Sequence, residues 1–198
     1  AELHARLHGC QLVSHLLRLY SSSADGAPAD RLELALSLTC RLALGSEPLA
    51  HQFAQAGGLS RSFVHRMLAP ANSSSAIVDV LLTISHLSRL SAAHARATIE
   101  HARVAPLLAA LLRHANAGVR SKACNLVGNL CRHSDRFYAE MRAHQLVPHL
   151  VICAQHADPS TRKFAAFAIG ARRPRAGSCA RASRASPVRL PQRTRWRQ

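Results

Sequence analysis

Two stretches of the chain, 42 residues apart, share one sequence pattern. The sequence VAPLL at 104–108 aligns with LVPHL at 146–150. Matched pairs continue in the same register: His114 with His156, Asn116 with Asp158, Arg120 with Arg162, Ala123 with Ala165, and Gly128 with Gly170. A period near 42 residues is typical of helical solenoids, in which each unit buries its apolar face against the next. The repeat therefore predicts an extended surface and not an enclosed catalytic pocket.

Helical periodicity divides most of the chain into units of a short, a medium and a long helix. Three helices per unit favour armadillo repeats over two-helix HEAT repeats. The sequence thus predicts an all-α fold, a right-handed α-solenoid of armadillo (ARM/HEAT-like) repeats. The expected parts are truncated or degenerate N-terminal helices at 1–44, repeats at 45–90 and 91–133, an incomplete repeat at 134–170, and a tail at 171–198.

Apolar spacing gives more specific expectations for single helices. Residues 2–20 follow helical spacing despite Gly9, as either the final helix of a repeat or a truncated first repeat would. Residues 30–44 carry apolar side chains on so many sides that we expect deep burial. In the long helix at 119–132, five residues face the core: Val119, Ala123, Leu126, Val127 and Leu130. Lys122, Asn125 and Asn129, with Arg132 or His133, share the opposite stripe.

The formal net charge of +16 comes largely from the tail. Residues 171–198 contain nine arginines and no acid, which leaves +7 for the rest of the chain. This composition predicts disorder. A genuine basic arm would bind phosphates, lipid headgroups or acidic proteins. A mis-joined exon or a shifted reading frame after Gly170 would give the same bias, and our hypothesis is such an artefact. A transcript whose arginine-rich frame continues across the Gly170 codon would contradict it.

Several site classes are not favoured. The six cysteines include no C-x-x-C pair, which indicates reduced, buried thiols. The histidines His4, His8 and His15 have helical spacing, but no carboxylate is placed beside them as in a metalloprotease helix, so we expect no metal and no cofactor. The longest apolar stretch, at 104–112, is far shorter than the roughly 20 residues of a membrane span. Nothing resembles a signal peptide, so we expect a cytoplasmic protein.

A family resemblance rests on the two best repeats. The stretch VRSKACNLVGNLCRH at 119–133, FY at 137–138, DP at 158–159 and TRKFAAFAIG at 161–170 resembles the C-terminal armadillo region of Fused-type serine/threonine kinases, which include plant (TWO-IN-ONE-type) and animal members. The resemblance is strong over 104–170, weak over 30–103 and absent from the tail.

The resemblance implies a non-catalytic scaffolding segment of a kinase whose catalytic domain is N-terminal. In that family the repeat region is associated with microtubule-based structures, in cytokinesis or in cilia, so it implies microtubule-associated protein partners and a cytoskeletal location. Residues 1–170 contain no Gly-rich phosphate loop, H-R-D or D-F-G motif, so this chain by itself is not expected to be an enzyme.

The candidate partner-binding stripe consists of Lys122, Asn125, Asn129, Arg132 and His86. Asn129 stands where armadillo proteins place an asparagine that binds an extended peptide, but His86 and Ala171 take that place in the neighbouring units. Importin-like recognition is therefore not favoured, and an ordinary solvated helix face is the alternative. If the stripe binds, replacing Asn129 and Lys122 should weaken partner capture without unfolding.

Two further functions remain as alternatives. A nucleic-acid or microtubule binder acting through the arginine-rich tail is one, although only eight aromatic residues make nucleic acid an unfavoured partner. An enzyme would need the upstream kinase domain. The oligomeric state is left open.

Overall fold

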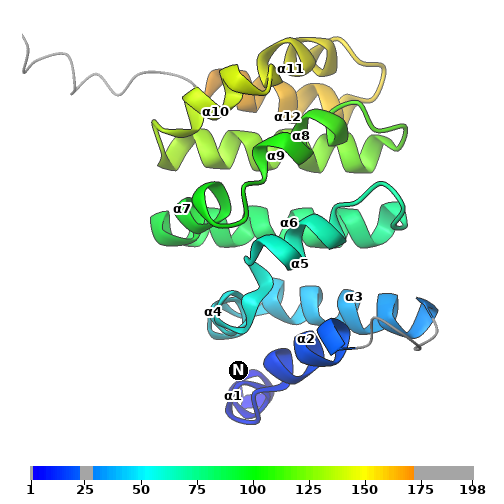
Figure 1. Cartoon of the computed structure of the whole chain (residues 1–198), viewed down its shortest axis with the longest axis vertical. Helices are drawn as coiled ribbons and strands as arrows, with labels where there is room; N and C mark the ends of the chain where they lie inside the picture. The colour runs from blue at the N-terminus through cyan, green and yellow to red at the C-terminus, as the bar shows by residue number, and fades with distance from the viewer. Residues whose placement is uncertain (1, 23–28, 172–198) are drawn as a thin grey trace, which may run out of the picture.

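The computed structural model describes residues 2–22 and 29–171, and within them the fold is all-α. Helical layers lie one upon another along the longest axis, from α1 at one end to α11 and α12 at the other (Figure 1). The predicted basic tail lies outside the described residues, except for Ala171.

The helices fall into successive layers that follow chain order. The N-terminal helices are α1 (Glu2–Gly9), α2 (Leu12–Ser22) and α3 (Ala29–Gly45). The next layer contains α4 (Glu47–Phe53), the π-helical turn η1 (Ala54–Gly58), α5 (Arg61–Met67) and α6 (Ser74–Leu90). Two triplets follow: α7 (Ala92–Glu100), α8 (Ala105–Leu111) and α9 (Ala117–His133), then α10 (Phe137–Ala143), α11 (Leu146–Ala154) and α12 (Pro159–Gly170).

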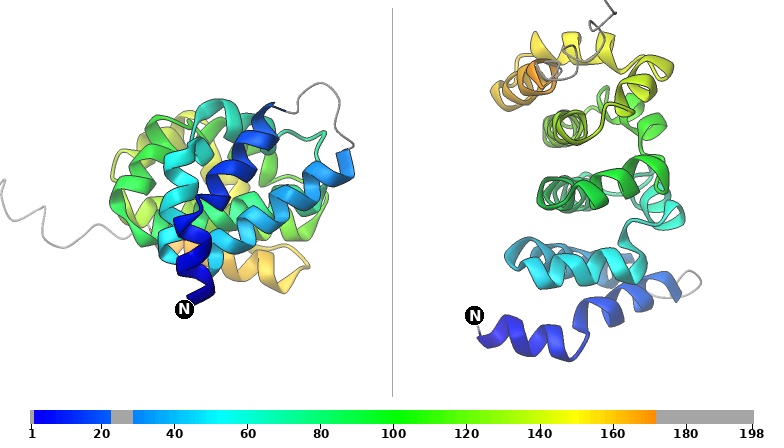
Figure 2. Two further views of the ribbon diagram at one scale, coloured as in Figure 1. Left: turned by 90° about the horizontal axis from the view of Figure 1, so that it is seen from below. Right: turned by 90° about the vertical axis from the view of Figure 1, so that its left-hand side faces the viewer.

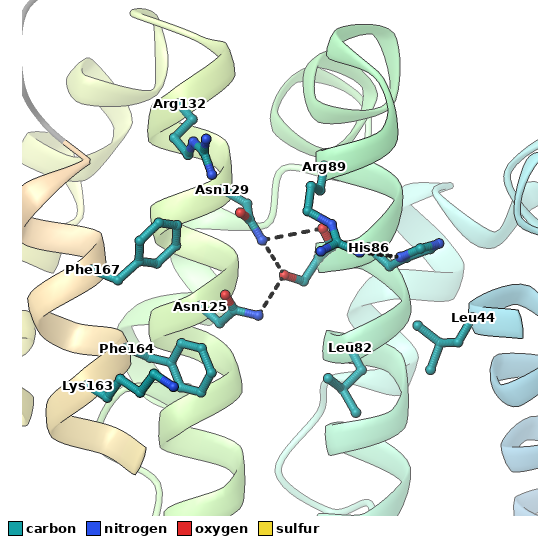
Figure 3. Close-up of a pocket in the computed structure, with 11 residues that line it drawn as sticks. Leu44, Leu82, His86, Arg89, Asn125, Asn129, Arg132, Lys163, Phe164 and Phe167 are labelled. Carbon is teal, nitrogen blue, oxygen red and sulfur yellow. Dashed lines mark hydrogen bonds between the residues drawn. The ribbon is translucent and has the colours of Figure 1, made fainter. Parts of the chain in front are cut away.

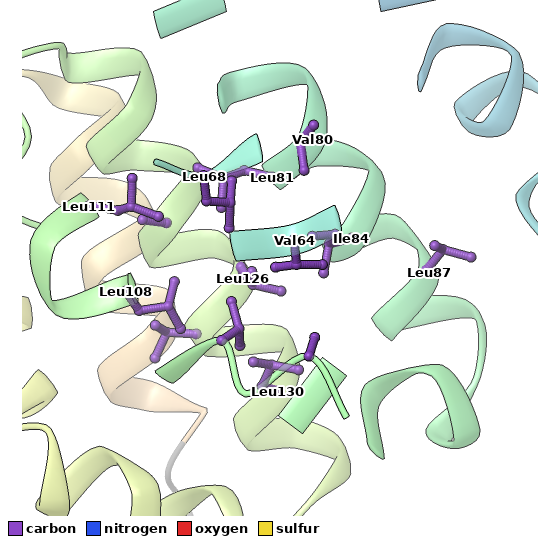
Figure 4. Close-up of a cluster of buried hydrophobic side chains, with 14 of the residues drawn as sticks. Val64, Leu68, Val80, Leu81, Ile84, Leu87, Leu108, Leu111, Leu126 and Leu130 are labelled. Atoms are coloured by element: carbon purple, nitrogen blue, oxygen red, sulfur yellow. The ribbon is translucent and has the colours of Figure 1, made fainter. Parts of the chain in front are cut away.

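The long helices form a stack of their own within the layers. α6 packs against α3 on one side and α9 on the other, and α9 packs in turn against α12. Figure 2 shows these long helices along one side of the stack and the shorter helices along the other. The apolar core lies between the two sides, where Val64 of α5 and Leu68, directly after α5, meet Leu81 and Ile84 of α6 and Leu126 of α9 (Figure 4).

Polar caps explain where three of the long helices begin. The side chains of Ser73, Asn116 and Asp158 accept hydrogen bonds from backbone N–H groups three residues later, at 3.1, 3.3 and 2.6 Å. Each cap satisfies a donor that the first helical turn leaves without a partner. Because the caps recur at nearly constant spacing, α6, α9 and α12 start in equivalent positions.

The helical spacing over residues 2–20 is divided between two helices, α1 and α2. The chain breaks between α1 and α2, where Gln11 has a left-handed φ of 55°. Gly9 weakens the end of α1 because glycine is a poor helix former. The buried Gln52 side chain then holds the break: it accepts from Val13 N at 3.1 Å and donates to His8 O at 3.1 Å.

The prediction of deep burial for the whole of residues 30–44 is wrong. Leu36, Cys40 and Ala43 of α3 are buried, but Leu34 is 72% exposed and Leu38 is 47% exposed. α3 contacts α2, α4 and α6, and these neighbours do not cover its full circumference. Apolar residues on every side therefore do not guarantee burial.

The thiols match the predicted burial at four of the five described cysteines. Cys40, Cys124, Cys131 and Cys153 are buried, whereas Cys10 is exposed and Cys179 lies outside the described residues. Burial raises the pKa of Cys40 to about 12, so its thiol stays protonated and unreactive. As for membranes, none of the helices in the described ranges has the length and apolar character needed to cross a bilayer.

Candidate binding groove

A groove of about 460 Å³ crosses the long helices α6, α9 and α12, with one side chain from the end of α3 (Figure 3). We call it the long-helix groove. It is lined by Leu44, Leu82, Ser85, His86, Arg89, Asn125, Asn129, Arg132, Lys163, Phe164 and Phe167.

The repeat register explains why these residues meet. α6 and α9 begin 43 residues apart, and α9 and α12 begin 42 residues apart. Leu82, Asn125 and Phe167 therefore occupy equivalent positions on three successive helices. Arg89 and Arg132 form a second row of the same kind. Stacked helices with equal spacing place equivalent side chains side by side, which turns a sequence period into a continuous surface.

Four of the five residues predicted as a partner-binding stripe line the groove: His86, Asn125, Asn129 and Arg132. The fifth, Lys122, lies beside it, with its Nζ 5.4 Å from the centre of the Phe164 ring. The sequence stripe thus lies on the groove side of α9.

The Asn129 side chain is buried, and its amide is hydrogen-bonded to a neighbouring helix. It is only 5% exposed, and Nδ2 donates to Ser85 Oγ at 2.7 Å and to Ser85 O at 3.5 Å. Asn125 Nδ2 donates to the same hydroxyl at 3.1 Å. These bonds tie α9 to α6 (Figure 3). The interpretation of Asn129 as part of a solvated stripe is therefore wrong, and replacing it will cost stability.

The groove carries positive charge at both ends. In Figure 3, Arg89 and Arg132 lie toward one end and Lys163 toward the other. No Asp or Glu belongs to the lining, and none of the ion pairs formed by the described residues includes any of these three cations. Their charge is therefore available to a ligand.

His86 adds no charge of its own at neutral pH. Burial lowers its pKa, and the nearby Arg89 lowers it further, against a weaker opposing effect of Glu47. Arg89 Nη2 lies 3.2 Å from His86 Nδ1, which suits a neutral imidazole that accepts from the guanidinium. The contact orients Arg89 without neutralising it.

Two phenylalanines, which the sequence stripe omitted, supply the apolar part of the groove. Phe164 and Phe167 of α12 are both half-buried. The Phe167 ring rests on Gly128 of α9, where an added Cβ would overlap Cε1 and Cδ1 of the ring. Lys163 Nζ lies 5.9 Å from the Phe164 ring centre, within cation–π range. Their signal in the sequence was the register itself, since Phe167 aligns with Asn125.

The arrangement suits binding more than bond-breaking chemistry. The lining holds no carboxylate and no thiol, and its histidine is engaged by Arg89. General acid–base or nucleophilic catalysis needs a positioned nucleophile and base within hydrogen-bond reach. Exposed cations around half-buried rings instead provide attraction and apolar contact.

Comparison with known proteins gives one partial sequence relative. No protein-family model matches the chain. A stretch of 91 residues is 35% identical to the serine/threonine-protein kinase TIO of Arabidopsis thaliana. This stretch is 46% of the chain but only 7% of that kinase, so the chain spans a small part of its relative.

Solved structures agree on the fold. A designed armadillo repeat protein in complex with the peptide (KR)4 has a TM-score of 0.74 at 20% identity, covering 86% of this chain and 68% of the other. A computationally designed armadillo repeat protein for modular peptide recognition has a TM-score of 0.75 at 21% identity, with the same coverage. The predicted architecture is confirmed: the chain has an armadillo-repeat fold and a partial similarity to a plant serine/threonine kinase.

Proposed function

We propose that this chain is a non-catalytic protein-interaction segment that holds a partner in the long-helix groove. The observation that carries the proposal is the groove itself, which gathers three cations and two half-buried phenylalanine rings with no carboxylate among them. A structural neighbour, a designed armadillo protein, is known in complex with a peptide. A peptide segment of a partner protein is thus a reasonable ligand here.

Within the predicted stripe, the residues have different roles in this proposal. Arg132 and Lys122 contact the partner. Asn125 and Asn129 hold α9 against α6 and so fix the shape of the groove. His86 orients Arg89. The repeats at 45–90, 91–133 and 134–170 then act as one surface, because each supplies one long helix to it.

The partial similarity to the kinase TIO supports a proposal for the cellular setting. We place the chain in the regulatory, non-catalytic part of a Fused-type kinase, acting in microtubule-linked signalling during cytokinesis or in cilia. Its partners would then be microtubule-associated proteins and its location the cytoplasm near the cytoskeleton. The stretch of 91 residues that is similar to part of TIO supports this assignment.

A capture experiment tests the groove. The immobilised full chain is incubated with a fraction of microtubule-associated proteins, and the bound proteins are quantified. Phe164→Ala should reduce capture severalfold, because it removes apolar contact from the groove floor. Ile152→Ala is the matched control, since Ile152 is an exposed apolar residue outside the groove. Equal capture by both variants would count against the groove.

A second candidate function rests on the tail. Nine arginines and no acid at 171–198 favour charge-driven binding to nucleic acid or microtubules. Such binding should disappear when residues 172–198 are removed and should weaken steeply with salt. Groove-dependent capture should survive that truncation.

A further inference from the structure

We infer that the long-helix groove selects an extended acidic segment that also carries an apolar side chain. The inference rests on the proposed function and specifies the chemistry of the ligand. It assigns carboxylate recognition to Arg89, Arg132 and Lys163. It assigns apolar recognition to Phe164, Phe167 and Leu82.

The positive charge of the groove indicates that its ligand is acidic. Arg132 and Lys163 are exposed, and Arg89 is exposed as well. All three line a groove without Asp or Glu. Guanidinium groups bind carboxylates through paired N–H donors, and charge-assisted hydrogen bonds are stronger than neutral ones. A basic ligand would meet like charge at both ends of the groove, whereas an acidic ligand would meet a counter-charge there.

The placement of the cations indicates that the ligand is an extended segment. Arg89 and Arg132 come from the last turns of α6 and α9, so they lie at the same end of adjacent helices. Lys163 lies in the first half of α12, near the other end of the groove (Figure 3). Carboxylates that reach both ends must be separated along the ligand, which fits an extended segment better than a single small anion.

The middle of the groove is apolar. Phe167 lies between the arginine end and Phe164, and Leu82 lies across the groove from Phe164 (Figure 3). Both rings are half-buried, so part of each ring still faces solvent. Covering that apolar area is favourable in proportion to the area removed from water. A ligand with an apolar side chain between its acidic residues uses this floor, and a purely acidic ligand does not.

Two lysine ammonium groups also lie next to the aromatic surface of the groove. The ammonium groups of Lys122 and Lys163 lie 5.4 and 5.9 Å from the centre of the Phe164 ring. These contacts hold two cations next to an apolar surface instead of letting both point away into water. An acidic side chain beside an apolar one therefore finds both of its partners at Phe164.

The test uses a fluorescein-labelled octapeptide of Asp and Glu with one central Leu, and the full chain. Fluorescence anisotropy measures its affinity for three proteins: the unaltered chain, the groove variant Arg132→Glu with Lys163→Glu, and the control variant Arg61→Glu with Arg142→Glu. Arg61 and Arg142 are exposed and lie outside the groove. Both double variants change the net charge equally, so attraction to the basic tail is matched between them.

We expect the groove variant to bind about tenfold more weakly or worse, and the control to change by less than about twofold. An acidic octapeptide without Leu should bind more weakly than the Leu-containing probe. An octapeptide of alternating Lys and Arg should bind most weakly of the three. Equal weakening by both double variants would overturn the inference, because binding would then follow total charge. Tighter binding of the Lys-Arg peptide would overturn it as well.

Two further measurements keep the outcome clear. Circular dichroism and thermal unfolding check that each variant folds, and Arg132→Gln with Lys163→Gln replaces the groove variant if it does not. The proposed function is judged separately by the Phe164→Ala capture experiment. If that capture depends on Phe164 but the acidic probe shows no groove dependence, the groove binds a partner of different chemistry and only the present inference fails.

Discussion

Two units of the stack share a sequence pattern but differ in what covers them: the third repeat, at 91–133 (α7–α9), and the fourth repeat, at 134–170 (α10–α12). The loop before each long helix has the same hydrogen bonds in both: Arg120 Nη1 donates to His114 O and Ala115 O, both at 2.7 Å. Arg162 Nη1 repeats this with the carbonyl oxygens of His156 and Ala157, at 2.9 and 2.6 Å. The local sequence therefore builds the same loop twice.

Position in the stack separates the two copies. Arg120 is 9% exposed, and its Nη2 also reaches His156 Nδ1 in the next repeat at 3.3 Å. Arg162 is exposed, and in the described part of the chain its hydrogen bonds stay within its own repeat. Likewise Gly128 is buried beneath Phe167, whereas nothing lies within 4 Å of a Cβ built on Gly170. The same residue type is thus a packing element in one repeat and a surface residue in the other.

The arginine pair should show the largest contrast. Arg120→Ala leaves two loop carbonyls and a buried space without the guanidinium, so we expect a loss of about 3 kcal/mol in the free energy of unfolding. Arg162→Ala removes equivalent bonds at an exposed site, where water replaces them, and should cost about 1 kcal/mol or less. Urea denaturation of both variants measures the difference. Equal losses would show that the loop, and not the stacking, determines the contribution.

The glycine pair comes next. Gly128→Ala forces the Phe167 ring to move, because the new Cβ would overlap it. We expect a loss of about 1–3 kcal/mol, which is usual for overpacking. Gly170→Ala meets nothing and gains helix propensity, so the change should be neutral or stabilising by up to about 1 kcal/mol. Thermal unfolding of the two variants gives the comparison, and a destabilised Gly170→Ala would argue against it.

The asparagine position gives a smaller effect. Ala171, directly after α12, stands where Asn129 stands in the third repeat, so Asn129→Ala places the same residue at both positions. The variant loses the bond to Ser85 Oγ inside a buried contact, and we expect a cost of about 1–2 kcal/mol. Asn125→Ala is the control, because Asn125 is only half-buried and bonds the same hydroxyl at a longer distance. If Asn129→Ala leaves the free energy of unfolding unchanged, the hydrogen bond from Asn129 to Ser85 does not hold α9 against α6.

The helix caps should give the smallest effect, visible as a pH dependence. The hydrogen bonds from Thr161 lower the pKa of Asp158 below its ordinary value of 3.8. A lowered folded-state pKa stabilises above the unfolded-state pKa, and the contribution is lost as pH falls through the folded-state pKa. Asp158→Asn should remove this acid sensitivity, and Asn116→Asp should introduce it in the third repeat. Unfolding measured at pH 7 and pH 3 tests the exchange, and an unaltered acid response in both variants would contradict it.

Much of the fold could be predicted because local chemistry repeats with the period. The spacing of apolar residues marked the helix triplets that became α7 to α12. The Asp-Pro pair at 158–159 is a helix-start signal of the same local kind, and Asp158 caps α12. By contrast, the break at Gln11 depends on Gln52, about forty residues away, and the exposure of Leu34 depends on which helices neighbour α3. Such long-range partners leave no local pattern.

The candidate groove was predictable only in part. Arg132 and Lys122 were found because they share one side of a helix, and that property belongs to a single segment. Phe164 and Phe167 belong to a different repeat, and their place in the groove results from how α12 lies on α9. The role of Asn129 was mistaken for the same reason, since its partner Ser85 lies on another helix.

The sequence by itself determined the helices, their caps and their period, because these depend on residues within a few turns of one another. Only the tertiary structure decided which of two identical template residues is buried and which is exposed. Burial depends on the neighbouring layer of helices. The contribution of an arginine or a glycine to the free energy of unfolding therefore depends on that layer more than on its own repeat.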